Sequence, residues 1–123
     1  MKTAMIEDKH SFDLEERTFK FAQNVRRFVK KLPRTVSNQE DVRQLIRASG
    51  SVGANYIEAN EALGQKDFRM KLRISRKEAK ECRYFLRLLD TGGREVLDGE
   101  REILVRESKE LTNIFSAIIK KAL

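Results

Sequence analysis

Six cationic side chains between residues 69 and 87 form the clearest chemical pattern in this chain. They recur at intervals of three and four residues: Arg69, Arg73, Arg76, Lys80, Arg83 and Arg87. At about 100° per residue, a helix places all six within an arc of about 80° and over a length of about 27 Å. Arginine can hold a phosphate or a carboxylate with two parallel hydrogen bonds. The pattern predicts a surface for an extended polyanion.

Two interpretations of this row of cations stay open. In the first, the six side chains contact the phosphates of RNA or DNA and release counterions. In the second, the row flanks a joint between subunits or a partner protein and pairs with acidic residues such as Glu58, Glu107 or Glu110. A solvated face without a partner is less favourable, because like charges three and four residues apart repel each other. The sequence contains no recognition-helix motif and no aromatic stacking platform, so we expect binding that depends on salt rather than on base sequence.

The residues that could support catalysis or metal binding are few. Cys82 falls in an apolar row, where a free cysteine behaves as a small hydrophobic residue, and His10 is the only histidine. These two residues cannot form a zinc cluster. A di-metal helical bundle needs Glu-x-x-His pairs, and the carboxylates that could suggest one have no such partner: Glu58, Glu61, Glu78 and Glu81. We expect no catalytic residue, no metal and no cofactor, and therefore no enzyme.

A polar cluster is predicted in the second half of the segment 38–64. Asn55 and Glu58 are three residues apart and are therefore neighbours on a helix surface. Where they lie between helices they need partners, and Arg47, Lys77 or Arg83 could supply them. We expect Arg47, Asn55 and Glu58 to form a structural polar network.

The apolar residues recur at three- and four-residue steps in four segments, which is typical of amphipathic helices. The first covers residues 13–32, with a capping box at Asp13 and Glu16, and Pro33 closes it. The second begins after Ser37 or Asn38 and ends at Gly64 as a C-terminal cap. The third covers residues 67–90, and the fourth runs from about residue 100 to the end.

Short links between four helices of similar length predict an all-α fold, an antiparallel up-down-up-down four-helix bundle. The bundle domain covers residues 13–123, and residues 1–12 form a flexible N-terminal segment. The chain of 123 residues, 40% of them hydrophobic, suits a single domain.

One stretch of the second helix is unusually slim. Five of the six residues from 49 to 54 are small where large side chains would be normal: Ser49, Gly50, Ser51, Gly53 and Ala54. An interior glycine destabilises a helix by roughly 1 kcal/mol relative to alanine, so closer packing should compensate. We expect the helix at 67–90, or another subunit, to approach this stretch closely.

The overall charge favours an acidic partner. Lys and Arg number 26 against 19 Asp and Glu, which gives a net charge of +7. The segment 67–90 holds eight basic and four acidic residues, so it contributes more than half of this excess. The N-terminal sequence MKTAMIEDKHSF lacks the apolar core of a signal peptide, and no window approaches the ~20 apolar residues of a membrane span. We expect a cytoplasmic protein without membrane contact.

Residues 44–89, QLIRASGSVGANYIEANEALGQKDFRMKLRISRKEAKECRYFLRLL, resemble the 23S ribosomal RNA intervening-sequence proteins. The similarity lies in the lead-in at Arg47, the Ala54-Asn55 and Glu58-Ala59 pairs, the Asp67-Phe68 helix start, and KEAKE followed by two aromatic residues and LL. Upstream, FAQNVRRFVKKLP is similar to the family's first helix and its closing proline. The chain departs from the family pattern at Gly50 and Gly53, where alanine is more usual, and at Phe85, where tryptophan is common.

This resemblance implies a homo-oligomer, a closed pentamer of four-helix protomers, with no established enzymatic activity. A related accessory protein of diversity-generating retroelements is a pentameric bundle that binds nucleic acid and a reverse transcriptase. The resemblance therefore favours electrostatic binding of RNA or DNA through the basic face. The alternative is a protein-interaction scaffold or accessory factor, for example of a reverse transcriptase, whose basic residues serve subunit or partner contacts.

Overall fold

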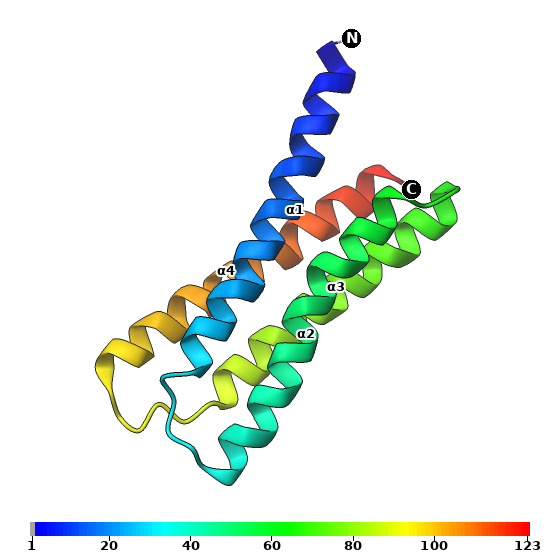
Figure 1. Cartoon of the computed structure of the whole chain (residues 1–123). Coiled ribbons are helices and arrows are strands. Elements are labelled where there is room, and N and C mark those ends of the chain that lie inside the picture. The colour runs from blue at the N-terminus through cyan, green and yellow to red at the C-terminus, as the bar shows by residue number, and fades with distance from the viewer. Residues whose placement is uncertain (1) are drawn as a thin grey trace.

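The computed structural model describes the backbone of residues 2–123 and the side chains from Asp13 onward. Four helices follow one another: α1 (Lys2–Val29), α2 (Val36–Asn60), α3 (Gln65–Leu88) and α4 (Glu95–Lys121). They run alternately up and down, with short links at the two ends of the bundle (Figure 1). The predicted all-α, four-helix bundle is confirmed, and residues 2–123 contain no strand.

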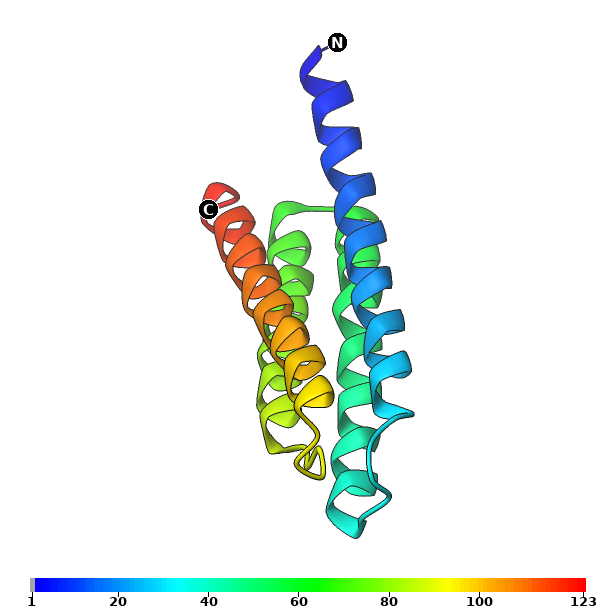
Figure 2. The ribbon, with the colours of Figure 1, turned by 90° about the vertical axis from the view of Figure 1, so that its left-hand side faces the viewer.

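The helices form a ring in which each packs against its neighbours in the chain. Contact is most extensive between α2 and α3 and between α3 and α4, and least extensive between α1 and α4. In the two views, α1 and α4 separate toward the end of the bundle that carries the C-terminus (Figures 1 and 2). As a result α3, the helix with the six cations, lies between two close neighbours, and the rest of its surface faces outward.

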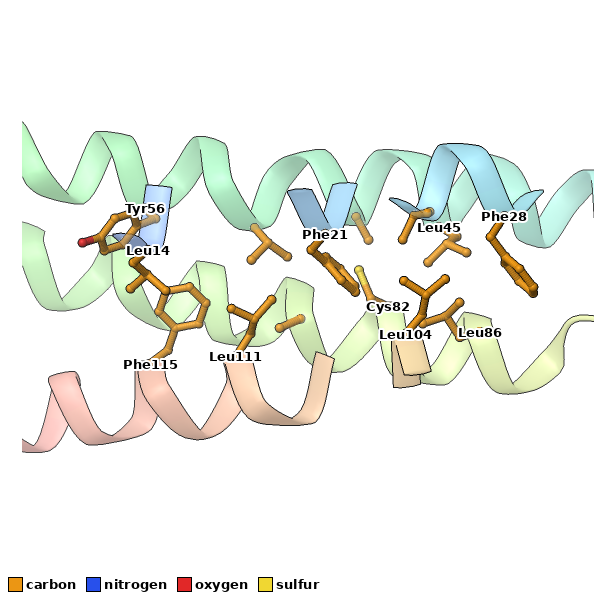
Figure 3. Close-up of a cluster of buried hydrophobic side chains, with 14 of the residues drawn as sticks. Leu14, Phe21, Phe28, Leu45, Tyr56, Cys82, Leu86, Leu104, Leu111 and Phe115 are labelled. Carbon is orange, nitrogen blue, oxygen red and sulfur yellow. The ribbon is translucent and has the colours of Figure 1, made fainter. Parts of the chain in front are cut away.

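The core consists of the apolar stripe of each helix (Figure 3). Residues from all four helices and the adjoining links are buried in it: Leu14, Phe21, Val25, Phe28, Leu32, Leu45, Ala48, Val52, Tyr56, Ala59, Leu72, Ala79, Cys82, Leu86, Leu89, Leu97, Leu104, Leu111, Phe115 and Ile119. Large aliphatic and aromatic side chains alternate with alanine and cysteine along the axis, so neighbouring helices interdigitate. The apolar periodicity of the sequence therefore orients every helix.

Several predicted helix ends are corrected by the structure. The first helix runs through Asp13, so Asp13 and Glu16 do not form a capping box at its start. Thr35 caps α2, and its hydroxyl oxygen accepts a hydrogen bond from the backbone N–H of Asn38 at 3.1 Å. The prediction that Gly64 caps the end of α2 is wrong: α2 ends at Asn60, and Gly64 has an extended backbone at the start of α3.

The fourth helix begins five residues earlier than predicted. Gly92 and Gly93 adopt positive φ angles of 68° and 74°, which ends the link after α3 and lets a helix begin at Glu95. Glu95 and Asp98 lie in its first turn, where acidic side chains interact favourably with the helix dipole.

The expectation that residues 1–12 are flexible stays a prediction, because it falls on side chains outside the described residues.

One buried amide joins the α1–α2 link to the α3–α4 link, which lie at the same end of the bundle. Asn38 is 2% exposed. Its Nδ2 donates hydrogen bonds to the backbone oxygens of Pro33 at 2.9 Å and Asp90 at 2.8 Å, and its Oδ1 accepts one from the Asp90 N–H at 2.9 Å. The α1–α2 link is therefore fixed to the α3–α4 link, which sets the register of the two helix pairs.

The slim stretch of α2 contacts α1 at Gly53. A β-carbon added to Gly53 would lie 2.8 Å from Oγ1 and 3.2 Å from Cβ of Thr18, a buried residue of α1. Thus α1, rather than α3 or another subunit, makes the close approach at this residue. Gly50 does not need the room, because its added β-carbon would meet only Nη2 of Arg26 at 3.5 Å. The contact of α2 with α3 includes a hydrogen bond from Ser75 Oγ to the Val52 oxygen at 2.9 Å.

Candidate nucleic-acid interface

The six cations predicted to share a helix face all lie on α3, and we call them the cationic stripe: Arg69, Arg73, Arg76, Lys80, Arg83 and Arg87. Four of them are exposed: Arg73, Lys80, Arg83 and Arg87. Arg69 and Arg76 are half-buried and turn toward α4. Arg69 Nη1 donates to the backbone oxygen of Ala122 at 3.0 Å, and Arg76 Nη1 donates to Ser116 Oγ at 3.3 Å. These bonds hold the two guanidinium groups in place without neutralising them.

No member of the cationic stripe forms an ion pair within residues 13–123. The ion pairs of this part of the chain join α2 to α3 or join α4 to α1 and the residues that follow it, and one lies within α4. The stripe therefore keeps its positive charge on the surface.

On the opposite flank of α3, three charged side chains form ion pairs with α2. Arg47 of α2 lies between two carboxylates of α3, with Nη1 3.3 Å from Glu78 and Nη2 3.0 Å from Glu81. The side chain of Glu78 is only 7% exposed, so its charge depends on this partner. Lys71 of α3 pairs with Glu58 of α2 at 3.3 Å.

The contact between α1 and α4 also contains ion pairs. Arg17 donates two hydrogen bonds to Glu107, at 2.8 and 2.7 Å, and a third to Glu110 at 2.6 Å. The hydrogen bonds to Glu107 raise the pKa of Arg17 above its ordinary value, so the guanidinium stays charged. Beyond the end of α1, Lys31 pairs with Glu100 at 2.6 Å. Glu58, Glu107 and Glu110, named from the sequence as possible partners of the stripe, thus have other partners in the chain.

The model of one protein family, the 23S rRNA-intervening sequence protein, matches residues 10–117. The chain belongs to this family. A solved relative is a protein of unknown function from the S23 ribosomal protein family of Bacteroides thetaiotaomicron VPI-5482, with 32% sequence identity and a TM-score of 0.71. The similarity covers 86% of this chain and 97% of that one. A search of curated proteins gives no match. The resemblance in the sequence is thereby confirmed.

The predicted polar residues have separate partners in this intervening-sequence protein. Arg47 pairs with Glu78 and Glu81, as described, and Glu58 pairs with Lys71. Asn55 donates from Nδ2 to the Ser51 oxygen of its own helix at 2.9 Å. The structure therefore distributes Arg47, Asn55 and Glu58 over separate contacts. Two of the three serve the α2–α3 contact.

The side chains considered for catalysis or metal binding lie apart from the stripe. Cys82 is buried in the core, and burial together with the Glu78 and Glu81 carboxylates raises the pKa of its thiol. Among the side chains from Asp13 onward, no three His, Cys, Asp or Glu residues are arranged to hold a metal ion. Within residues 2–123, none of the helices is long and apolar enough to cross a membrane.

Sequence reasoning missed one exposed aromatic residue of this family member. Tyr84 is 59% exposed on α3, among the cations of its outer surface. Its ring packs against Phe85 with the centroids 5.3 Å apart and the planes at 83°. The signal was present in the spacing, because Lys80 precedes Tyr84 by four residues and Arg87 follows it by three.

Proposed function

We propose that this chain is a non-enzymatic homo-oligomer that binds RNA or DNA electrostatically through the cationic stripe of α3. The observation that carries the proposal is that six cations share one face of α3 and none of them forms an ion pair within residues 13–123, whereas Lys71, on the side of the same helix that faces α2, pairs with Glu58. A row of about 27 Å can follow a phosphate backbone over several nucleotides. Membership of a family named after an rRNA intervening sequence agrees with a nucleic-acid partner.

The energetics of α3 support an external anion. Like charges three and four residues apart destabilise a helix by roughly 0.2–0.5 kcal/mol for each pair. Arg73 and Lys80 have no carboxylate beside them to offset this repulsion among residues 13–123. Phosphates bound along the stripe remove the repulsion and release counterions to the solvent. Recognition of this kind depends on charge and spacing rather than on base sequence.

Self-association is part of the same proposal, and the family resemblance favours a pentamer. A groove of about 510 Å³ lies between α1 and α2, lined in part by Phe19, Ala22 and Ile57. Phe19 is 59% and Ile57 is 49% exposed, which supports a protein contact on this side of the bundle. The groove involves α1 and α2, so contact between copies there leaves the outer face of α3 available. The proposed location is the cytoplasm.

The test is a binding titration across a salt series. Six phosphate contacts predict a plot of log K against log salt with a slope of about −5 on duplex and about −4 on single strands. The variant Arg73→Glu/Lys80→Glu/Arg87→Glu changes three exposed residues, so the fold should be retained. It should lower affinity at least about a hundredfold and flatten the slope to about −3 on duplex.

The matched control is Lys20→Glu/Lys30→Glu/Arg34→Glu, which changes three exposed cations outside α3 and lowers the net charge by the same amount. It should retain most of the affinity and of the slope. Equal losses in the two variants would show that net charge alone drives binding and would overturn the assignment to α3. If the α3 variant instead dissociates the oligomer in light scattering while binding is unchanged, the stripe is a subunit or partner contact.

A further inference from the structure

An exposed aromatic ring lies in the middle of the outer face of α3. At about 100° per residue, Tyr84 projects between Lys80 and Lys77, with Arg87 one turn further along. Lys77, Lys80 and Arg87 are all exposed. The nearest carboxylate along the helix, Glu81, is paired at 3.0 Å with Arg47, which it shares with Glu78. Tyr84 therefore has a positively charged environment.

The ring is held rather than free to turn in solvent. Phe85 packs against the core, and the Tyr84 ring meets it nearly at a right angle, with the centroids 5.3 Å apart. A shallow hollow of about 500 Å³ adjoins the ring and is also lined by Gln44, Arg47, Lys77, Lys80, Glu81 and Phe85. Three of these residues are cations and one is a carboxylate, which pairs with Arg47, so the aromatic, amide and cationic groups suit a flat heterocycle joined to an anion.

We propose that Tyr84 stacks on an unpaired base, while Lys80 and Arg87 hold the phosphates on either side of it. This inference rests on the proposed function and makes it more specific, because phosphate contacts alone accept single and double strands alike. Within a duplex, each base face is covered by the next base pair, so an aromatic side chain at the surface meets only the bases of loops, bulges, ends and single strands. The protein should therefore prefer single-stranded nucleic acid.

The intrinsic fluorescence of the protein gives a direct readout of this contact. The chain has two tyrosines and no tryptophan. Tyr56 is buried at 4% exposure, so the variant Tyr56→Phe leaves Tyr84 as the sole tyrosine. Titrating this variant with oligothymidylate should quench its tyrosine emission, because a base stacked on the ring provides a route for energy loss. An abasic oligonucleotide with the same number of phosphates should bind without comparable quenching.

Affinity gives the second readout. Oligothymidylate should bind the wild type on the order of tenfold more tightly than the abasic strand, in line with the contribution of one stacked base. Tyr84→Ala should remove this difference, whereas Tyr84→Phe should keep it because the ring is retained. Ile103→Ala is the control, since Ile103 is a similarly exposed hydrophobic residue on α4, at 63%. It should leave the difference unchanged.

The outcomes separate this inference from the proposed function. If both strands bind with the expected salt dependence but with equal affinity and no quenching, stacking is excluded and electrostatic binding stands. If Tyr84→Ala and Ile103→Ala have the same effect, the assignment to Tyr84 is overturned. If neither strand nor a duplex binds at low salt, the proposed function and the stacking site fall together.

Discussion

Both flanks of α3 carry charged side chains, but only those on the flank toward α2 form ion pairs among residues 13–123. Toward α2, two carboxylates, Glu78 and Glu81, share Arg47, and Lys71 pairs with Glu58. Toward α4 and the outside, the six cations of the stripe have only a backbone oxygen and a hydroxyl as partners among residues 13–123. The charged groups toward α2 thus have ionic partners within residues 13–123, whereas the cations of the stripe have none.

The flank of α3 that faces α2 therefore stabilises the fold, whereas the stripe has the proposed binding role. Ion pairs at the α2–α3 contact fix how the two helices face each other, because a buried carboxylate such as Glu78 tolerates few other arrangements. The stripe adds nothing comparable to the fold, since like charges at helical spacing repel. Side chains that share one helix face and reduce stability by repelling one another are candidates for binding an external anion. We therefore expect substitutions at packed or ion-paired residues to change stability more than substitutions within the stripe.

The largest effect is expected where packing is tightest, at Gly53. An added β-carbon would lie 2.8 Å from Thr18 Oγ1, so Gly53→Ala should lower the free energy of unfolding by about 1–2 kcal/mol, even after the gain in helix propensity. Gly50→Ala has ordinary contact distances and should raise it by up to about 1 kcal/mol. Urea denaturation at a fixed protein concentration measures both. If Thr18→Ala fails to relieve the loss in the Gly53→Ala background, the close approach of α1 is not its cause.

The second prediction compares one arginine from each flank of α3. Arg47→Ala leaves the buried Glu78 carboxylate without its cation and should destabilise the fold by about 1.5 kcal/mol, less than for a fully buried pair because the Arg47 side chain is 53% exposed. Arg73→Ala removes an exposed member of the stripe and should change stability by less than about 0.5 kcal/mol. The measurement is the urea midpoint of each variant. Equal destabilisation would mean that the two flanks do not differ in the way their ion pairs suggest.

The third prediction concerns how stability depends on pH through Cys82, which lies near Glu78 and Glu81. The thiol of Cys82 ionises at about 9.0 when unfolded, and in the fold burial and then Glu78 and Glu81 raise its pKa. Above pH 9 the unfolded chain therefore releases a proton that the folded chain keeps, and stability falls by about 1.4 kcal/mol per pH unit from this group. Cys82→Ala removes that contribution. The stability difference between wild type and variant should shrink between about pH 8 and about pH 10, and a constant difference would contradict a shielded thiol.

The fold could be predicted from the sequence because one face of each helix is apolar at a regular spacing. Leu72, Ala79 and Leu86 of α3, for example, are placed in the core by their seven-residue intervals alone. The helix ends were harder, since several residues near each end could act as caps. Thr35, rather than Ser37 or Asn38, caps the start of α2, because its hydroxyl oxygen accepts a hydrogen bond from the Asn38 N–H. The Asn38 side chain instead joins the two links.

The candidate site was predictable only in part. The spacing of the stripe predicts which cations share a face, and the structure places them together on α3. Partners across helices could not be predicted, because they depend on how two helices rotate and slide against each other. Arg47 reaches Glu78 and Glu81 rather than Asn55 or Glu58, and Gly53 meets α1 rather than α3. The spacing of Tyr84 from Lys80 and Arg87 was visible in the sequence, but its exposure, which the structure gives, was needed to recognise it as a candidate.

The smallest expected effect is the response of stability to sodium chloride, and its sign reports which flank dominates. Screening weakens the repulsion within the stripe and should stabilise the fold, whereas screening of the Arg47–Glu78 pair is limited by burial. The wild type should therefore gain a few tenths of a kcal/mol between low and moderate salt. Arg73→Gln/Lys80→Gln/Arg87→Gln should lose most of this gain, and Lys20→Gln/Lys30→Gln/Arg34→Gln should keep it. A wild type that salt destabilises would mean that attraction across the helix contacts outweighs repulsion along α3, which would weaken the argument that the stripe needs an external anion.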